Sequence, residues 1–270
     1  MGLFDILDDI TEKQIMKTDT GDNRIFGVVV GQIAQNYNQD MPGRVCVTIP
    51  TRDKEANELK WARVAMPSGG SKWGHYFLPE VGDQVLIAFE QGNIEKPYVI
   101  GCISKDNNQF LKKAVDQDNQ FKKIVTRNGN TIYFEDNKEG EGEKDKIHII
   151  TAKNGHKIEL DNEKNVILVS DKDGKNMIQM KTETGQTTIK AEKKLTIEVG
   201  TNITLILNGG NGTVQIKASK LDVDTSGNID MNASGSAKIS AGNISIESNA
   251  MLKLSSSGAV TVAGAPIKLG

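Results

Sequence analysis

The sequence has no aromatic residue after Phe134, although it continues to Gly270. All seven Phe, four Tyr and two Trp lie between Phe4 and Phe134, and five of the six prolines lie between Pro42 and Pro97. The first half therefore has the large anchors and turn-setting residues that a compact core needs, whereas the second half has only small aliphatic side chains to bury. This shift in composition predicts a boundary between two kinds of structure.

Other absences exclude whole classes of protein. Cysteine occurs only at Cys46 and Cys102, too few for a disulfide framework, so we expect two reduced thiols in a protein made in the cytoplasm. The 33 basic and 35 acidic residues nearly cancel, which argues against a nucleic-acid-binding surface. The longest apolar runs, such as 26–30, are too short to span a bilayer, and the first residues lack the basic flank of a secretory signal.

No group of residues predicts catalysis, a cofactor or a metal site. The three histidines, His75, His148 and His156, do not have the spacing of zinc ligands, so we expect each to have a surface or structural role. The charged run 136–146 contains Gly140 and Gly142 and is typical of a solvated loop. The sequence therefore predicts a protein that is not an enzyme.

The first half shows short strands separated by turn residues. Apolar residues alternate over 45–49 and 84–89, and a third run at 98–100 lies between a proline and a glycine. This pattern predicts a small antiparallel barrel or sandwich. We expect its core or interfaces to be filled by the large side chains, with the core favoured: Trp61, Trp73, Phe77 and Phe89. Before the strands, apolar residues at helical spacing over 3–10 predict either a docking helix or a frayed terminus.

Four segments in this region are specific in order and spacing. They are GRVCVTIP at 43–50, WARVAMP at 61–67, GHYFLPEVGDQVLIAF at 74–89 and GNIEKPYVIG at 92–101. Gly82 and Asp83 suit a tight turn, because glycine accepts positive φ and aspartate can bond to backbone amides. Pro97 can open a strand, and Gly101 is expected to close it.

Together these segments resemble the OB-fold domain of the phage baseplate protein V and VgrG spike family, over about residues 25–105. The resemblance implies a barrel that joins a trimeric hub to a needle, without the basic aromatic face by which other OB folds bind nucleic acid. It also implies structural roles for the motif residues Gly43, Arg44, Pro79, Gly82, Asp83, Phe89, Gly92, Pro97 and Gly101.

From Leu195 onward, pairs of apolar residues separated by one position recur at an almost constant spacing. Successive pairs start 8, 11, 7, 8, 8, 7, 8, 8 and 7 residues apart: Leu195/Ile197, Ile203/Leu205, Val214/Ile216, Leu221/Val223, Ile229/Met231, Ala237/Ile239, Ile244/Ile246, Leu252/Leu254, Val260/Val262 and Ile267/Leu269. Gly227, Gly235, Gly242 and Gly258 lie between pairs. Such a repeat predicts a β-solenoid of short strands with one buried face.

Three strands of this length are needed for each layer of a solenoid, and the sequence fits two ways to supply them. One chain could form 24-residue coils, or three chains could wind together as a triangular prism. The lack of a triplet superperiod favours three chains, as does the resemblance to a family whose needles are intertwined trimers of octads. Residues 121–190 repeat Asn-Gly or Asp-Gly turns followed by alternating strands, which predicts hairpins in a widened root of the same needle.

We therefore predict an all-β homotrimer: an N-terminal OB barrel followed by a triple-stranded intertwined β-helix of octad repeats. The expected parts are an N-terminal docking segment (1–24), the OB barrel (25–105), a linker (106–120), the β-helix root (121–190) and the octad needle (191–270). The function expected from the resemblance is an envelope-piercing spike of a contractile injection system, in a phage tail or an extracellular phage-tail-like bacteriocin. The alternatives are a single-chain β-helix adhesin or a polysaccharide-acting enzyme.

The resemblance also implies assembly partners. No hub domain precedes the barrel in this sequence, so we expect a separate baseplate hub protein, with the target cell envelope as the surface that the needle meets. The C-terminal residues predict an apolar layer with open backbone edges, on which the family resemblance places a PAAR-type tip protein. The residues expected to bind this cap are Ala265, Pro266, Ile267, Lys268, Leu269 and Gly270.

Overall fold

The computed structural model describes residues 24–50, 60–106, 108–140 and 142–268. It divides into two compact units, residues 1–194 and 195–270, each of which is described by itself. Apart from Arg24, the expected docking segment 1–24 lies outside the described residues.

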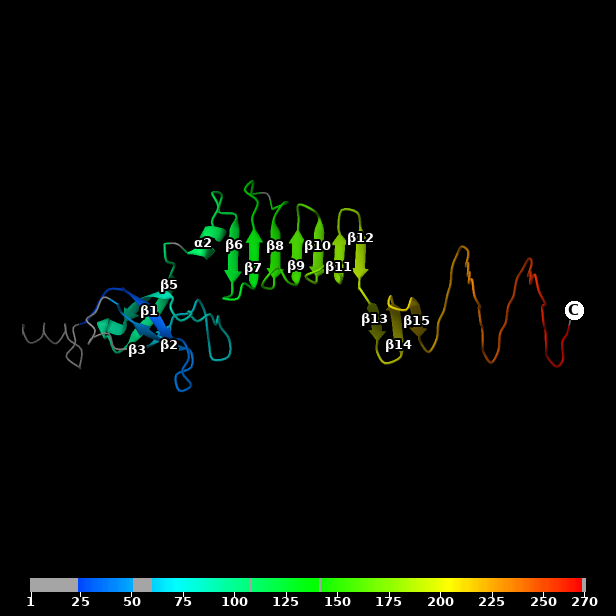
Figure 1. The fold of residues 1–270 in the computed structure, drawn as a ribbon, viewed down its shortest axis with the longest axis horizontal. Helices are drawn as coiled ribbons and strands as arrows, with labels where there is room; N and C mark the ends of the chain where they lie inside the picture. Colours follow the sequence, from blue (N-terminus) through cyan, green and yellow to red (C-terminus); the bar gives the residue numbers. More distant parts are fainter. Residues whose placement is uncertain (1–23, 51–59, 107, 141, 269–270) are drawn as a thin grey trace, which may run out of the picture. The chain divides into compact units, whose positions relative to one another are not determined.

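Five strands near the N-terminus form a closed barrel (Figure 1). They are β1 (Val29–Gln35), β2 (Arg44–Thr48), β3 (Lys60–Val64), β4 (Gln84–Phe89) and β5 (Pro97–Ile103), and a short 3-10 turn, η1 (Glu90–Gly92), follows β4. The strand order is β1-β2-β3-β5-β4, and β4 pairs with β1 to close the ring. All pairs are antiparallel except β3 with β5.

The barrel core is built from small aliphatic side chains. Its buried residues are Ile33, Val45, Val47, Ile49, Ala62, Val85, Ile87 and Val99, with Phe89 packed at its margin. A glycine at position 31 lets β1 approach β4, since a Cβ there would collide with the Ile87 side chain and the Thr48 carbonyl. Close packing between strands therefore takes the place of large aromatic anchors.

The prediction that Trp73 and Phe77 fill this core is wrong. They are 67% and 63% exposed, because they lie in the connection between β3 and β4 and not on inward-facing strand positions. The expectation that Gly101 closes its strand is also wrong, since β5 runs on to Ile103. Gly101 is registered opposite Leu86 on the paired strand β4, next to a register shift that leaves Ile100 without a partner.

After the barrel, a short helix leads into a seven-stranded antiparallel sheet (Figure 1). The helix α2 (Gln109–Ala114) begins at Asn108, whose side chain accepts hydrogen bonds from the N–H groups of Phe110 and Leu111. The strands follow in chain order: β6 (Phe121–Val125), β7 (Thr131–Glu135), β8 (Lys146–Ile150), β9 (Lys157–Asp161), β10 (Val166–Ser170), β11 (Met177–Lys181) and β12 (Gln186–Lys190).

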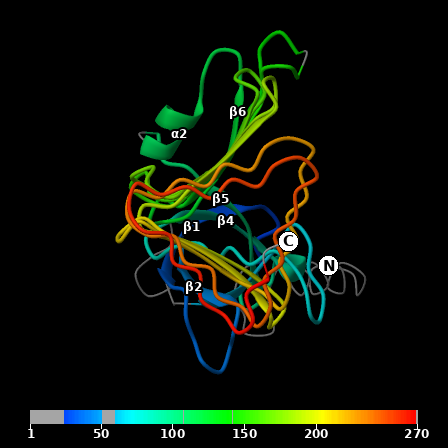
Figure 2. The same ribbon diagram turned by 90° about the vertical axis from the view of Figure 1, so that its right-hand side faces the viewer.

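This sheet is a meander in which every strand pairs with its neighbours in sequence. Each adjacent pair of strands is joined by five registered residue pairs. Glycines at positive φ, such as Gly129 at 94° and Gly185 at 65°, turn the chain between strands, as hairpins require. Viewed after a 90° turn, the strands lie nearly behind one another as a single layer (Figure 2).

The second unit begins with a small sheet and continues without strands. β13 (Lys194–Val199), β14 (Ile203–Asn208) and β15 (Thr213–Lys217) are neighbours in the order β13-β14-β15. The first three octad pairs, from Leu195 to Ile216, thus lie on strands that pair within the chain. Residues 218–268, all described, contain no assigned helix or strand, and Figure 1 shows them as successive extended segments joined by turns.

The predicted all-β fold with an N-terminal OB barrel is confirmed as a mostly β fold, in which long antiparallel sheets follow the barrel and α2 is a short helix. Among the residues that the structure describes, no helix is both long and apolar enough to cross a bilayer.

Candidate assembly surface

One face of the sheet β6–β12 is mainly apolar. Side chains alternate between the two faces of a strand, so the second and fourth residues of each five-residue strand share a face. The register aligns the fourth residue of β6 with the second of β7, and so on across the sheet. The result is an unbroken row of β-branched side chains: Ile124, Ile132, Ile149, Ile158, Val169, Ile178 and Ile189.

A second row runs beside the first on the same face. Its members are Lys122, Phe134, Ile147, Leu160, Ile167, Met180 and Thr187, so the only charge lies at one edge of the sheet. The aliphatic members of the first row remain 38–54% exposed in a single chain. We call these two rows the apolar face. A continuous face of this kind marks an interaction surface, because soluble proteins bury such surfaces.

The opposite face of the sheet is polar and carries ion pairs. Lys146 Nζ lies 2.8 Å from Glu163 and 3.5 Å from Glu135, and Lys157 Nζ lies 2.8 Å from Glu159. The central row of this face contains Lys123, Tyr133, His148, Glu159, Leu168, Gln179 and Thr188. The sheet is therefore amphipathic, and apart from Lys122 at the edge its charged strand residues lie on this face.

His148 is buried on this polar face, at 7% exposure. Its ring stacks on Tyr133, with centroids 4.3 Å apart and planes 14° apart. Burial lowers the pKa of His148, and although Glu159, Glu135 and Asp161 raise it, burial prevails. Burial likewise raises the pKa of Tyr133. The histidine thus has a structural place, as a neutral ring packed between strands.

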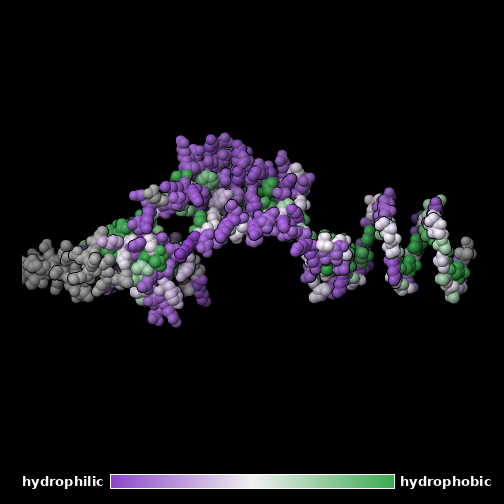
Figure 3. Space-filling view, viewed as in Figure 1, coloured by the Kyte–Doolittle hydropathy of each residue, from purple (hydrophilic) through white to green (hydrophobic). Residues whose placement is uncertain are grey.

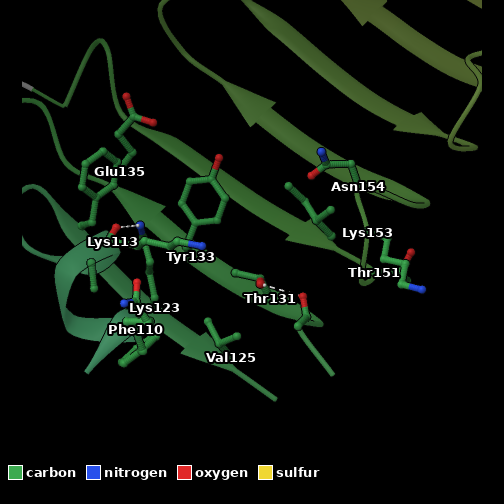
Figure 4. A pocket seen from close by; sticks show the side chains of 15 residues that line it. Phe110, Lys113, Lys123, Val125, Thr131, Tyr133, Glu135, Thr151, Lys153 and Asn154 are labelled. Atoms are coloured by element: carbon green, nitrogen blue, oxygen red, sulfur yellow. Dashed lines mark hydrogen bonds between the residues drawn. The ribbon is translucent and has the colours of Figure 1, made fainter. Parts of the chain in front are cut away.

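A groove of about 720 Å³ lies between α2 and the polar face (Figure 4). Lys123 crosses it: its Nζ donates to the carbonyl of Lys113 at 3.1 Å and lies 4.4 Å from the ring centroid of Phe121. The hydrogen bond ties the helix α2 to the sheet, and the cation–π interaction with Phe121, a residue of the same strand, holds the Lys123 side chain in place. Lys123 therefore acts in the packing of α2.

Residues 218–268 expose the predicted apolar pairs. Their large apolar side chains, from Leu221 to Ile267, are 48–86% exposed, and Figure 3 shows hydrophobic surface on successive segments of this region. The backbone here forms no strand ladder within the chain. In this segment the apolar side chains are exposed to solvent, and the backbone N–H and C=O groups are not paired in a strand ladder.

The predicted cap-binding residues divide between described and undescribed parts of the chain. Ala265, Pro266, Ile267 and Lys268 are exposed residues outside any strand, and Leu269 and Gly270 lie outside the described residues.

The motif residues of the barrel lie mainly where strands begin and end. Gly43 (φ 77°) and Arg44 open β2, Phe89 ends β4 opposite Pro97, which opens β5, and Gly92 (φ 78°) lies in η1. Pro79, Gly82 and Asp83 form the turn before β4, in which the N–H of Glu80 donates to Asp83 Oδ2 at 2.9 Å. Gly101 lies inside β5. These residues position strands, and the structure brings no two of them together as a reactive pair.

Cys46 is buried and Cys102 exposed, and both are free thiols. Within the described ranges, no group of three or more His, Cys, Asp or Glu side chains could hold a metal ion.

Comparison with known proteins identifies the barrel. Residues 29–103 match the family model described as the Type VI secretion system/phage-baseplate injector OB domain. The chain is 31% identical over 87 residues to the Type VI secretion system spike protein VgrG2a of Pseudomonas aeruginosa, and 33% identical over 85 residues to VgrG5 of the same species. It is 34% identical over 83 residues to VgrG3 of Vibrio cholerae.

These matches cover only part of each protein. They span 30–31% of this chain and 8–11% of the three relatives. The barrel is thus an OB domain of the kind found in phage-baseplate injectors and Type VI secretion system VgrG spike proteins. The apolar face lies outside the matched region and depends on the structure for its recognition.

Proposed function

We propose that this chain is one subunit of a homotrimeric, envelope-piercing spike of a contractile injection system, in a phage tail or a phage-tail-like bacteriocin. The OB barrel anchors the subunit to the baseplate, and residues 121–270 contribute one third of a needle. The family of the barrel supports a role in a contractile injection system. The trimeric needle is argued from the exposed apolar side chains and unpaired backbone of the residues after the barrel.

The segment 218–268 carries this proposal. Its apolar pairs are exposed and its peptide groups lack strand partners within the chain. An extended segment in this state would be unstable in water, because both kinds of group need cover or partners. Two further copies wound around the same axis supply both at once, as strands of a triangular prism with an apolar interior.

The alternative of one chain closing its own coils has less support. A single-chain solenoid places each strand beside another about three octads away in the same chain, and a ladder between them would join these strands. Residues 218–268 have no such ladder. A single-chain β-helix adhesin or polysaccharide-acting enzyme requires such a ladder between the coils of one chain. Both alternatives are therefore less well supported.

The proposed action is mechanical. Contraction of a sheath drives the rigid prism into the target envelope, and layers without free lateral edges resist unfolding under load. In this role the chain is not an enzyme and needs no cofactor. It is made in the cytoplasm and assembled at the centre of a baseplate.

A baseplate role implies assembly partners. We assign a baseplate hub to the barrel and a PAAR-type cap to residues 265–270, in keeping with the family resemblance. Retention of full cap binding after deletion of residues 265–270 would contradict the second assignment.

The mass of the full chain in solution tests the proposal. Light scattering should give a particle of about 88 kDa, three times the 29.4 kDa of one chain. A stable, folded particle of one chain would contradict the proposed function, because the needle would then lack the partners that its exposed segments require.

A further inference from the structure

We infer that a cationic hollow on the outer wall of the OB barrel binds the acidic side of residues 3–12, in the docking segment of the same chain. The hollow forms around Arg44 and Arg63, and the segment lies outside the described residues. Carboxylates would hold the segment on the barrel and leave its apolar side for a baseplate partner. The contact forms within one chain, so this inference goes beyond the proposed function and does not depend on the number of chains in the spike.

The hollow lies where β2, β3 and β5 run side by side, and it has a volume of about 190 Å³. It combines three cationic side chains with one carboxylate, and its lining consists of Arg44, Arg63, Glu90, Lys96, Pro97 and Tyr98. The register places Arg44 directly opposite Arg63, and Arg63 directly opposite Tyr98. The next pair along β2 and β3, Val45 with Ala62, is buried in the core, so the two arginines point outward.

Among the described residues, the two arginine side chains have no hydrogen bond or ion pair. Glu90 is the one acidic residue in the described lining, and it is already bonded: the Tyr98 hydroxyl donates to its Oε2 at 2.7 Å, and Lys96 Nζ donates to its Oε1 at 3.0 Å. These hydrogen bonds, the one from Tyr98 above all, lower the pKa of Glu90, and the charge of Arg63 is the smallest cause. The hollow therefore keeps an excess of positive charge.

An anion between the two arginines would stabilise this arrangement. Like charges that lie directly opposite one another on neighbouring strands repel and destabilise the pair. A carboxylate suits the position, because guanidinium groups bind carboxylates through paired, charge-assisted hydrogen bonds. The geometry of the hollow thus favours acidic side chains as its ligand.

The docking segment is tethered beside this hollow. Arg24 Nη1 donates to the carbonyl of Gln91 at 2.9 Å, and the N–H of Ile25 donates to the carbonyl of Gly92 at 3.0 Å. Both acceptors follow Glu90 directly in the turn η1, and Glu90 lines the hollow. The connection 13–23 can span up to about 36 Å, at roughly 3.3 Å per residue, so residues 3–12 are well within reach.

The sequence of the docking segment carries two stripes at helical spacing. Carboxylates occupy positions 5, 8, 9 and 12, and aliphatic residues occupy positions 3, 6, 7 and 10. An offset of two positions corresponds to about 200° around a helix, so the two stripes fall on opposite sides. The acidic stripe, which consists of Asp5, Asp8, Asp9 and Glu12, supplies the charge that the hollow lacks.

The tether allows weak contacts to suffice. A single exposed ion pair is marginal, because water and salt screen it. A partner on a short flexible linker, however, is present at an effective concentration of the order of 1 mM, so a contact with a dissociation constant of about 0.1 mM would be about 90% formed. The amide protons of 3–12 should then exchange about tenfold more slowly than in a free segment.

Hydrogen exchange of the full chain, followed by mass spectrometry, tests the inference. Residues 3–12 should be protected in the parent chain. Arg44→Glu/Arg63→Glu should remove this protection, and so should Asp8→Lys/Asp9→Lys, which leaves the barrel unchanged. Combining the two sets of substitutions swaps the charges and should restore the protection. Protection of β1–β5 in the same data shows whether each barrel is folded.

The matched control is Lys72→Glu/Lys105→Glu. It makes the same change in net charge at exposed positions outside the hollow, and it should preserve the protection of 3–12. Rapid exchange of 3–12 in the parent chain would overturn the inference. Protection that survives Asp8→Lys/Asp9→Lys would also overturn it, since the contact would then not depend on the carboxylates.

Light scattering of the same samples separates this inference from the proposed function. A three-chain particle in which residues 3–12 exchange freely would overturn the inference and leave the homotrimer intact. A one-chain particle in which the charge swap restores protection would contradict the proposed function and support the contact between hollow and docking segment.

Discussion

The sheet β6–β12 and the segment 218–268 share a side-chain pattern but differ in where their backbone finds partners. Both place two apolar residues on one face of most extended segments; in the sheet, these are the five strands from β7 to β11. In the sheet, every strand pairs with its neighbours in sequence. The segment 218–268, which we call the tail, has no strand pairing within the chain. The side-chain pattern thus predicts which face is buried, but it does not predict whether the backbone hydrogen bonds form within one chain or between chains.

The length of the repeat also differs between the two regions. The strands of the sheet start 9 to 15 residues apart, and β13, β14 and β15 start 9 and 10 apart. After Val214 the apolar pairs start only 7 or 8 residues apart. The shortest repeats of the sheet combine a five-residue strand with a four-residue turn, as at 162–165 and 182–185. An octad is one residue shorter than that repeat, although the eight-residue step from Leu195 to Ile203 also joins strands of one sheet, β13 and β14.

The glycines support this interpretation of the repeat length. Gly174, Gly185 and Gly212 lie in turns with φ of 65–67°, the left-handed conformation that brings a chain back beside itself. In the described tail, Gly227 and Gly235 are not at positive φ. The tail glycines redirect the chain without folding it into a hairpin, which leaves room for strands from other chains.

The largest expected effect that separates the two regions comes from a charge in the tail. Ile246→Asp would bury three carboxylates near one axis, at a cost of about 3 kcal/mol or more for each chain. We expect the amide protons of 218–268 to lose protection from hydrogen exchange, while β6–β12 keeps its protection and the particle stays trimeric. Hydrogen exchange followed by mass spectrometry measures both regions in one experiment.

Ser245→Asp is the matched control, since it adds the same charge at the neighbouring position of the opposite parity. Its exchange pattern should equal that of the parent chain. If Ile246→Asp left the tail protected, the buried prism proposed for this region would be wrong. If it also unfolded the root, the two regions would be one cooperative unit and the contrast between them would fail.

The sequence predicted part of this contrast. Constant intervals after Val214 are visible without a structure, and so are the Asn-Gly and Asp-Gly turns of 121–190. The position of His148 beside Tyr133 was not predictable, because it depends on a register across the ten-residue connection 136–145, whose charged residues specify no register. Trp73 was misplaced for a similar reason: its size predicts burial, but its backbone lies outside the barrel strands.

Glycine substitution should give an intermediate effect that differs between the regions. Gly185 has φ of 65°, and a Cβ added there would have nothing within 4 Å, so Gly185→Ala costs only the backbone strain of a left-handed residue, about 1–2 kcal/mol. Gly235 is equally open but is not at positive φ, so Gly235→Ala should cost no such strain. Chemical denaturation of the two variants measures the difference. Equal destabilisation would show that the turns at positions 185 and 235 require the same backbone conformation.

The smallest expected effect is a dependence of root stability on pH, which His148 should confer and the tail should lack. The pKa of His148 in the folded chain lies below its ordinary value of about 6.5, because burial disfavours the charged ring. The unfolded chain therefore binds more protons, and the free energy of unfolding should fall as the pH drops below about 6.5 and level off above it. Tyr133, Glu135, Lys146, Glu159 and Asp161 surround the ring on β7, β8 and β9 and set the size of this fall.

Thermal unfolding between about pH 5.5 and pH 8 measures this slope, above the range in which the carboxylates take up most of their protons. His148→Gln should flatten it, whereas His156→Gln, which removes an exposed ring from the turn between β8 and β9, should preserve it. No histidine follows His156 in the sequence, so protection of 218–268 should not acquire a histidine-dependent slope of its own. An unchanged slope in His148→Gln would mean that the stacked ring is protonated at no cost. The root and the tail would then not differ in pH dependence, and the contrast between them would rest on backbone pairing.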